Sequence, residues 1–126
     1  MSNLKLPKMS FDNLSKLTKP GESKKIAYET WAYQYNDGSI SVIHHSSVIA
    51  NISEGGSKLY ITNAGWGSPT TRNRIDQILR DSSIPFWVTQ KNFVQYLRSL
   101  DGTLMADFHD ATFWDGRLDS FNGKAL

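Results

Sequence analysis

The sequence predicts an α+β fold: an antiparallel β-meander sheet with one main helix packed on one face, and a flexible or weakly helical N-terminal arm. Three observations lead to this fold class. Short runs of β-branched and aromatic residues alternate with glycine-containing turns between residues 26 and 62. A helix-start pattern follows at Ser68-Pro69. The first 25 residues carry six lysines and two prolines with little periodicity, which indicates an arm.

A chain of 126 residues can form one domain with a modest core. We expect a basic arm over residues 1–25, a single α+β domain over residues 26–121 and a tail over residues 122–126. The content of 39% apolar and 21% charged residues is typical of soluble globular proteins. The absence of cysteine excludes disulfides and thiolate catalysis, and no apolar run approaches membrane-spanning length.

The positive charge is concentrated at the N-terminus. Residues 1–25 hold six lysines against two acidic residues, a balance of +4, and the rest holds eight basic and ten acidic residues, a balance of −2. Such an arm can contact phosphate backbones or an acidic partner, or can simply keep a leader segment in solution.

The first elements follow from local patterns. Residues 10–17 can form a short helix with apolar residues at three-residue spacing, and a Pro-Gly turn ends it. Residues 26–35 alternate partly and predict a strand, which Asn36-Asp37-Gly38-Ser39 turns into a hairpin because Asp-Gly tolerates positive φ values. Further strands are expected over residues 40–44, 47–53 and 58–62.

The main helix is expected over about residues 69–80. Ser68 is the predicted N-cap with Pro69 at the first helical position, and Thr70 is the alternative N-cap. Its apolar stripe is Ile75, Ile78 and Leu79, and Pro85 prevents continuation.

The region from residue 86 to residue 98 can be read in two ways. Residues 92–97 could be helical, but the β-forming Phe86-Trp87-Val88 favours a long or bent strand. Asp101-Gly102 predicts a hairpin to residues 104–108, and Asp115-Gly116 predicts a last hairpin before a frayed tail.

The junction between strand and helix is the leading candidate for a binding site. Free N–H groups at a helix start, hydroxyls and guanidinium groups can together hold an anion, and an exposed tryptophan can stack on a ring. A structural reading explains the same residues as a helix cap, with the tryptophan in the core and Arg72 paired to Asp76. The predicted binding residues are Trp66, Ser68, Thr70, Thr71, Arg72 and Arg74, with Lys91 as a more distant candidate.

The junction also resembles a group of small bacteriophage proteins. In that group a Gly-Gly-Trp turn precedes a helix start of the form Thr-Thr-Lys/Arg-x-Arg-Ile-Asn, followed by an aromatic strand with Gln-Lys and a terminal Phe-x-Asp-Gly. The matching segments here are 64–66, 70–76, 87–91 and 113–116, with Ala64 in place of glycine and Asp76 in place of asparagine. The resemblance implies a phage or phage-like origin and an intracellular life in the host, and it implies no particular reaction.

Other clusters carry weaker signals. His44 and His45 are adjacent on a strand and therefore face opposite sides, so they are poorly placed to share a metal. Asp107 and His109 could share a face and, with Asp110 nearby, do acid–base work or hold a metal, or could be ordinary turn residues. The aromatic residues of segments 28–35 and 86–96 could form a stacking platform for nucleic acid, but they more commonly form a core face and a protein interface.

The sequence therefore predicts a non-enzymatic phage-type accessory protein that binds a protein partner or assembles with itself, in the host cytoplasm or in the virion. The alternative is nucleic-acid or nucleotide binding through the helix start and the basic arm. We expect no catalytic residue, no metal and no cofactor. A metal-dependent hydrolase built on Asp107 and His109 is the third and least favoured hypothesis.

Overall fold

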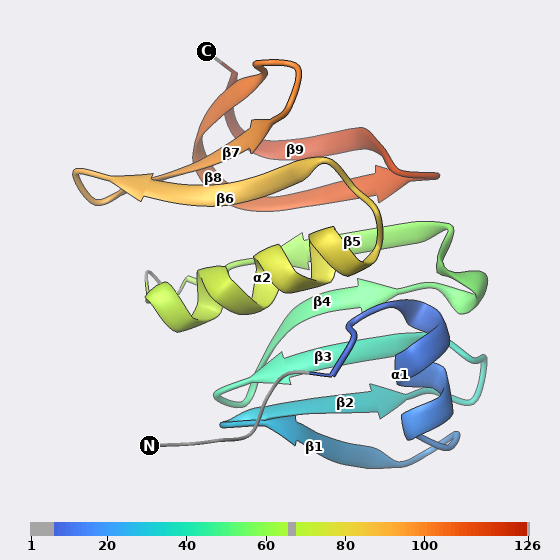
Figure 1. The fold of residues 1–126 in the computed structure, drawn as a ribbon. Helices are drawn as coiled ribbons and strands as arrows, with labels where there is room; N and C mark the ends of the chain where they lie inside the picture. Colours follow the sequence, from blue (N-terminus) through green and yellow to red (C-terminus); the bar gives the residue numbers. More distant parts are fainter. Residues whose placement is uncertain (1–6, 66–67, 126) are drawn as a thin grey trace.

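The computed structural model describes residues 7–65 and 68–125, with the backbone only for the last two of these. Figure 1 shows the described elements in chain order. They are α1 (Phe11–Leu17), β1 (Ser23–Ala27), β2 (Thr30–Gln34), β3 (Ile40–His44), β4 (Ser47–Ile52), the short 3-10 helix η1 (Glu54–Gly56), β5 (Lys58–Thr62), α2 (Pro69–Asp81), β6 (Phe86–Lys91), β7 (Val94–Ser99), β8 (Leu104–Trp114) and β9 (Arg117–Ala125).

The described strands form one antiparallel sheet in the order β1-β2-β3-β4-β5-β8-β7-β6, and β9 pairs with β8 off this path. Strand β8 is the branch point of the sheet. Its second half pairs with β5 and its first half pairs with β7, while β9 pairs with both halves. A bulge separates the halves near Asp107, which has a φ of 54°. The fold class predicted from the sequence, a meander sheet with one main helix, is confirmed.

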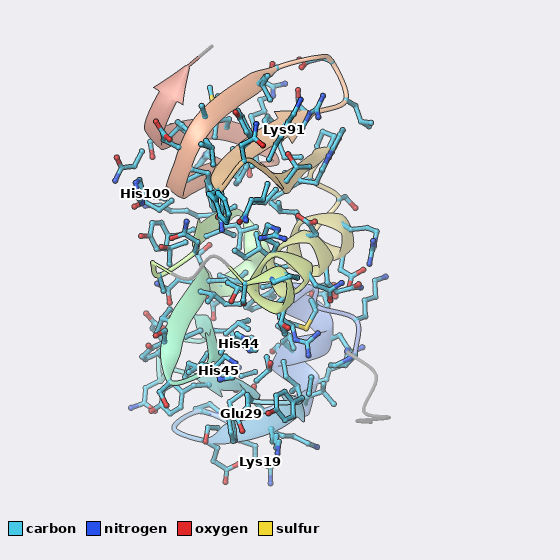
Figure 2. The ribbon with its side chains drawn as sticks, turned by 90° about the vertical axis from the view of Figure 1, so that its left-hand side faces the viewer. Lys19, Glu29, His44, His45, Lys91 and His109 are labelled. Atoms are coloured by element: carbon cyan, nitrogen blue, oxygen red, sulfur yellow. The ribbon has the colours of Figure 1, made fainter. Side chains whose placement is uncertain are left out.

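The side chains of the sheet divide into two faces. Register pairs such as Val42 with Ala50 and Ala50 with Ile61 place one set of residues on the face that meets the helices. Both helices lie on this side of the sheet in Figure 2. The buried core is formed by Met9, Leu14, Ile26, Ala32, Ile40, Val42, Ile49, Ala50, Ile52, Leu59, Ile61, Ile75, Ile78, Leu79, Ile84, Val88, Leu97, Phe108, Ala111 and Phe113.

Helix α2 begins and packs as its sequence predicts. The Ser68 hydroxyl accepts a hydrogen bond from the Thr71 N–H at 3.2 Å, and Pro69 takes the first helical position. The stripe of Ile75, Ile78 and Leu79 is fully buried. The Asp76 carboxylate accepts a hydrogen bond from the Val88 N–H at 2.7 Å, which ties the helix to the outer edge of β6.

The N-terminal segment is part of the domain from residue 7 onward, which differs from the separate arm expected over residues 1–25. Met9 and Leu14 are fully buried in the core, and the Met9 N–H donates to the Asp81 carboxylate at 2.7 Å. The helix expected over residues 10–17 forms as α1, with Ser10 as its N-cap. Apolar burial outweighs the charge of the lysines between residues 7 and 25, which are exposed. Residues 1–6 lie outside the described part of the chain.

Two hairpins are placed differently from the sequence prediction. The strand expected over residues 26–35 is two strands joined at Tyr28-Glu29, and the bent strand expected over residues 86–98 is the pair β6 and β7 joined at Asn92-Phe93. Neither turn contains the glycine that marks such turns, although Glu29, Asn92 and Phe93 all have positive φ values. At the C-terminus, β9 continues to residue 125, so the frayed tail expected from residue 122 is paired with β8.

Candidate functional site

The turn that follows β5 has a structural centre in Asn63. The Asn63 side-chain amide donates to the Gln95 side chain at 3.0 Å and to the Phe108 carbonyl at 2.7 Å, and its oxygen accepts from the Gly65 N–H at 2.8 Å. This buried amide therefore joins β5, β7 and β8 where the sheet branches. Trp66, the predicted stacking residue, lies outside the described residues.

The predicted hydroxyls at the start of α2 serve the helix cap. Ser68 and Thr71 bond to each other through their hydroxyl oxygens at 2.9 Å, and Thr71 is fully buried. Thr70 is exposed in the first turn. Of the three hydroxyls, Thr70 is the one that faces solvent.

The two predicted arginines diverge from the helix. The Arg72 guanidinium donates to the Gln90 side chain on β6 at 2.8 Å, whereas Arg74 Nε donates to the Thr30 hydroxyl on β2 at 3.2 Å. Lys91 is exposed at the end of β6, next to Gln90. The structure thus brings Arg72 to the strand that carries Lys91 and directs Arg74 to the opposite side of the helix.

Arg74 belongs to a polar cluster around His44, beneath the start of α2. The Thr30 hydroxyl donates to the Tyr28 carbonyl at 2.7 Å, so its contact of 3.0 Å with His44 Nδ1 is an acceptance from an Nδ1–H. His44 Nε2 then carries a lone pair, and it is buried with no hydrogen-bond partner among the described residues. Burial, followed by the charges of His45 and Arg74, lowers the pKa of His44.

His45 lies just beyond the end of β3 with a φ of 49°, so the alternation of side chains expected along a strand does not separate the rings of His44 and His45, whose centres are 4.2 Å apart. His45 is exposed, and its Nδ1 lies 3.8 Å from the Glu29 carboxylate (Figure 2). Within residues 7–65 and 68–123, no group of three or more His, Cys, Asp or Glu side chains is arranged to hold a metal ion.

Asp107 and His109 are exposed beside the bulge of β8. They line a small polar hollow of about 220 Å³ together with Asn63, Gln95 and the fully solvated ring of Phe93. Asp110 is half-buried on the following stretch of β8, where its carboxylate accepts from the Asn122 amide at 3.4 Å.

The sheet face opposite the two described helices carries several aromatic side chains. Trp31 and Tyr33 point to this side, because their register partners Ile43 and Ser41 alternate with the buried core residues of β3. The Tyr35 hydroxyl bonds to Ser41 at 2.9 Å on the same side. We call this surface the aromatic face and define it by Trp31, Tyr33, Tyr35, Ile43, Tyr60 and Trp114.

The residues of the aromatic face form two groups, one on and beside β2 and β3 and one on β5 and β8, with polar residues of β3 and β4 between them. A row of register partners runs across the face from β2 to β9. Trp114 lies two residues beyond this row along β8, opposite Lys58 on β5. The partners in this row are Tyr33, Ser41, Asn51, Tyr60, Thr112 and Ser120.

The aromatic rings of this face are partly open to solvent. Trp114 is 52% exposed and Tyr35 is 42% exposed, while Trp31, Tyr33 and Tyr60 are half-buried. A hollow of about 370 Å³ lies beside Tyr60, with Asn51, Lys58 and Thr112 on its walls. Partly exposed large rings, one of them beside a hollow with polar side chains on its walls, are typical of a binding surface.

Basic side chains border the aromatic face. Lys25 Nζ lies 5.5 Å from the centre of the Trp31 ring, within the range of a cation–π contact. Lys58 and Arg117 are the register partners of Trp114 on its two neighbouring strands, and both are exposed. Asp110 faces the same side, near the end of β5.

Sequence reasoning found only half of this surface. The aromatic run of residues 28–35 pointed to Trp31, Tyr33 and Tyr35, whereas Tyr60 joins the face through the pairing of β4 with β5 and Trp114 through the pairing of β5 with β8. The pairing of β5 with β8 links residues about 50 positions apart, and no local pattern encodes it. The aromatic residues of segment 86–96 do not all join this face. Phe86 packs against Phe113 in the core, with ring centres 5.1 Å apart.

No helix among the described residues is long and apolar enough to cross a membrane. Comparison with curated proteins and with solved structures finds no match. The sequence profile of one family, described as Kyanoviridae Gp96 protein, matches residues 7–118. This range includes α1, in agreement with the packing of the N-terminal segment into the core. The chain therefore belongs to the Kyanoviridae Gp96 family of phage proteins.

Proposed function

We propose that this phage accessory protein is non-enzymatic and acts by binding another protein through the aromatic face. The observation that carries the proposal is the set of partly exposed tryptophan and tyrosine rings on the sheet face opposite the two described helices. We place this activity in the host cytoplasm or in the virion, where the proteins of a phage act.

Physical chemistry supports a protein partner. Tryptophan and tyrosine are enriched in the centres of protein interfaces, because they bury a large area and lose little side-chain entropy. The middle of the aromatic face is polar but uncharged, with the exposed Asn51 and the half-buried Thr112 on it. Hydrogen-bonding groups of this kind fix the orientation of a partner, and charged groups border the face in the way that a polar rim borders an interface.

The test compares binding by the wild-type protein and by the double variant Trp31→Ala/Trp114→Ala. Immobilised protein is exposed to extracts of phage-infected cells, and specifically retained proteins are quantified by mass spectrometry. We expect the affinity of the double variant for its partner to be at least about 30-fold lower than that of the wild type. This factor corresponds to the loss of one interface residue that contributes about 2 kcal/mol to binding. The variant Phe93→Ser is the control, because Phe93 is 96% exposed and lies off this face. Equal retention by the two variants and the wild type would refute a role for the aromatic face.

Single-stranded nucleic acid is the second candidate, and the position of Lys25 over Trp31 favours it. Bases stack on aromatic rings while lysine and arginine contact the phosphates, and Lys58 and Arg117 beside Trp114 offer the same combination. The helix start offers less to a nucleotide, since Ser68 and Thr71 satisfy the cap.

The nucleic-acid candidate predicts binding of a fluorescent single-stranded oligonucleotide that weakens with salt. The logarithm of affinity should fall against the logarithm of salt with a slope of about −0.7 per phosphate contact. Lys58→Glu/Arg117→Glu should reduce that slope, whereas Lys16→Glu, an exposed change on α1, should leave it unchanged. Arg72→Ala tests the helix start separately. An affinity that none of these changes alters would exclude both nucleic-acid surfaces.

A further inference from the structure

The side of the molecule that carries the helices has an apolar groove of about 590 Å³ at the C-terminal end of α2. Its lining residues come mostly from the stretch where the chain leaves α2 and enters β6, which can be followed as a ribbon in Figure 1. Cavities of this volume are large enough to bury an apolar side chain together with its neighbours. The groove is lined by Pro85, Phe86 and Trp87 from the start of β6, by Asp76 and Arg80 from α2, and by Leu100.

Leu100 stands out from the edge of this groove. Its side chain is 79% exposed, directly after the buried Ser99 at the end of β7. Its backbone is held in place, because the Leu100 N–H donates to the Pro85 carbonyl at 3.3 Å and the Asp101 carboxylate accepts from the Thr103 N–H at 3.0 Å. Leu100 is therefore a fixed apolar protrusion beside an apolar hollow.

We propose that two copies of this chain form a symmetric dimer in which the Leu100 of each copy enters the groove of the other. A two-fold interface requires one surface patch that is complementary to itself, and a protrusion next to a hollow meets that requirement. The patch is also complementary in charge: Asp101 is exposed beside the protrusion and Arg80 is exposed on the wall of the groove. Across a two-fold axis, the Asp101 of one copy faces the Arg80 of the other.

Asp76 in the groove does not oppose this arrangement. Its carboxylate already accepts the Val88 N–H, and the charges of Arg80 and Arg72 act on it favourably. The proposed dimer leaves the aromatic face, on the opposite side of the sheet, open to a partner. The dimer is independent of the proposed function, and each can fail without the other.

Light scattering and sedimentation velocity over a range of protein concentrations test the dimer. We expect a dimer for the wild type, and Leu100→Asp should raise its dissociation constant about a hundredfold, because two equivalent contacts are lost at once. Phe93→Asp is the matched control, since Phe93 is an exposed apolar residue on the other hairpin turn of β7 and should leave the dimer intact. A wild-type protein that stays monomeric up to its solubility limit, or an equal effect of the two changes, would overturn the proposal.

Disulfide trapping tests the same contact by a second readout. The chain has no cysteine, so each introduced thiol is unique. Leu100→Cys protein mixed with Ser83→Cys protein should form a mixed disulfide dimer on mild oxidation, because Ser83 lines the groove. Phe93→Cys with Ser83→Cys should form it much more slowly. Equal rates for the two pairs would place the contact elsewhere, and an oligomer that forms with a different protein only would also overturn the proposal.

Discussion

His44 shows how a single buried residue makes the stability of this protein depend on pH. Its Nδ1–H is satisfied by Thr30, while its Nε2 is buried without a partner in the described part of the chain. Protonation would place a second charge beside the Arg74 guanidinium, so burial and this neighbour favour the neutral ring.

The lowered pKa of His44 predicts acid sensitivity below its ordinary value of 6.5. As pH falls below 6.5, the unfolded chain takes up a proton on this residue and the folded protein does not, so the free energy of unfolding decreases until pH reaches the lowered folded pKa. Urea unfolding at pH about 7.5 and about 5 measures this loss. Between these two pH values, the free energy of unfolding of His44→Gln should decrease by less than that of the wild type. For His109→Gln, a change at an exposed residue, the decrease should equal that of the wild type. A His44→Gln protein as acid-sensitive as the wild type would contradict the assignment.

Asn63 is the residue on which the branched sheet depends. Asn63→Ala leaves the Phe108 carbonyl and the Gln95 side-chain oxygen without this donor in a buried site, and we expect a loss of about 2–3 kcal/mol in the free energy of unfolding. Denaturant titration measures it. Asn122→Ala is the comparison. Because Asn122 is exposed, this change should lower the free energy of unfolding by less than about 0.5 kcal/mol. Similar costs for the two changes would show that the branch does not need this amide.

At the scale of elements, the contact between Asp76 and Val88 attaches α2 to the edge of the sheet. Burial raises the pKa of the Asp76 carboxyl, so its charge is costly in this position, while its oxygen satisfies a strand N–H. Asp76→Asn keeps the acceptor without the charge and should leave stability at neutral pH unchanged or slightly higher. Asp76→Ala should cost about 1–2 kcal/mol, measured by urea unfolding. A large decrease in the free energy of unfolding for Asp76→Asn would mean that the charge itself stabilises the helix.

The turn between β6 and β7 is strained by its second residue. Asn92 and Phe93 have φ values of 51° and 66°, the positive region in which glycine is far more favourable than phenylalanine. Because the Phe93 ring is almost fully exposed, Phe93→Gly removes the strain and little packing. We expect stabilisation of about 1 kcal/mol in thermal or urea unfolding. A destabilised variant would indicate that the ring makes contacts with the protein that matter in solution.

At the scale of the whole molecule, the predictable features are those encoded by neighbouring residues. The Ser68-Pro69 start, the apolar stripe of α2 and the Asp-Gly hairpins at Gly102 and Gly116 each depend on a few consecutive positions, and the structure has all of them. The Tyr28-Glu29 hairpin turn was missed because its residue types do not mark a turn.

The candidate site was less predictable for a related reason. The helix-start residues have two readings, as a cap or as an anion site, and only coordinates show that Ser68 and Thr71 bond to each other. Tyr60 and Trp114 come to the same sheet face as Trp31 through strand pairing over long separations, which depends on the arrangement of the entire sheet.

The central claim is that the aromatic face is the surface through which this phage protein meets its partner. Photocrosslinking tests it most directly: a photoreactive amino acid replaces Tyr60 on the face in one protein and Lys16 on α1 in another, and both are expressed during infection. We expect a defined crosslinked product from position 60 that is absent from position 16 and is suppressed by Trp114→Ala. The same products from both positions, or a product from position 16 alone, would contradict it.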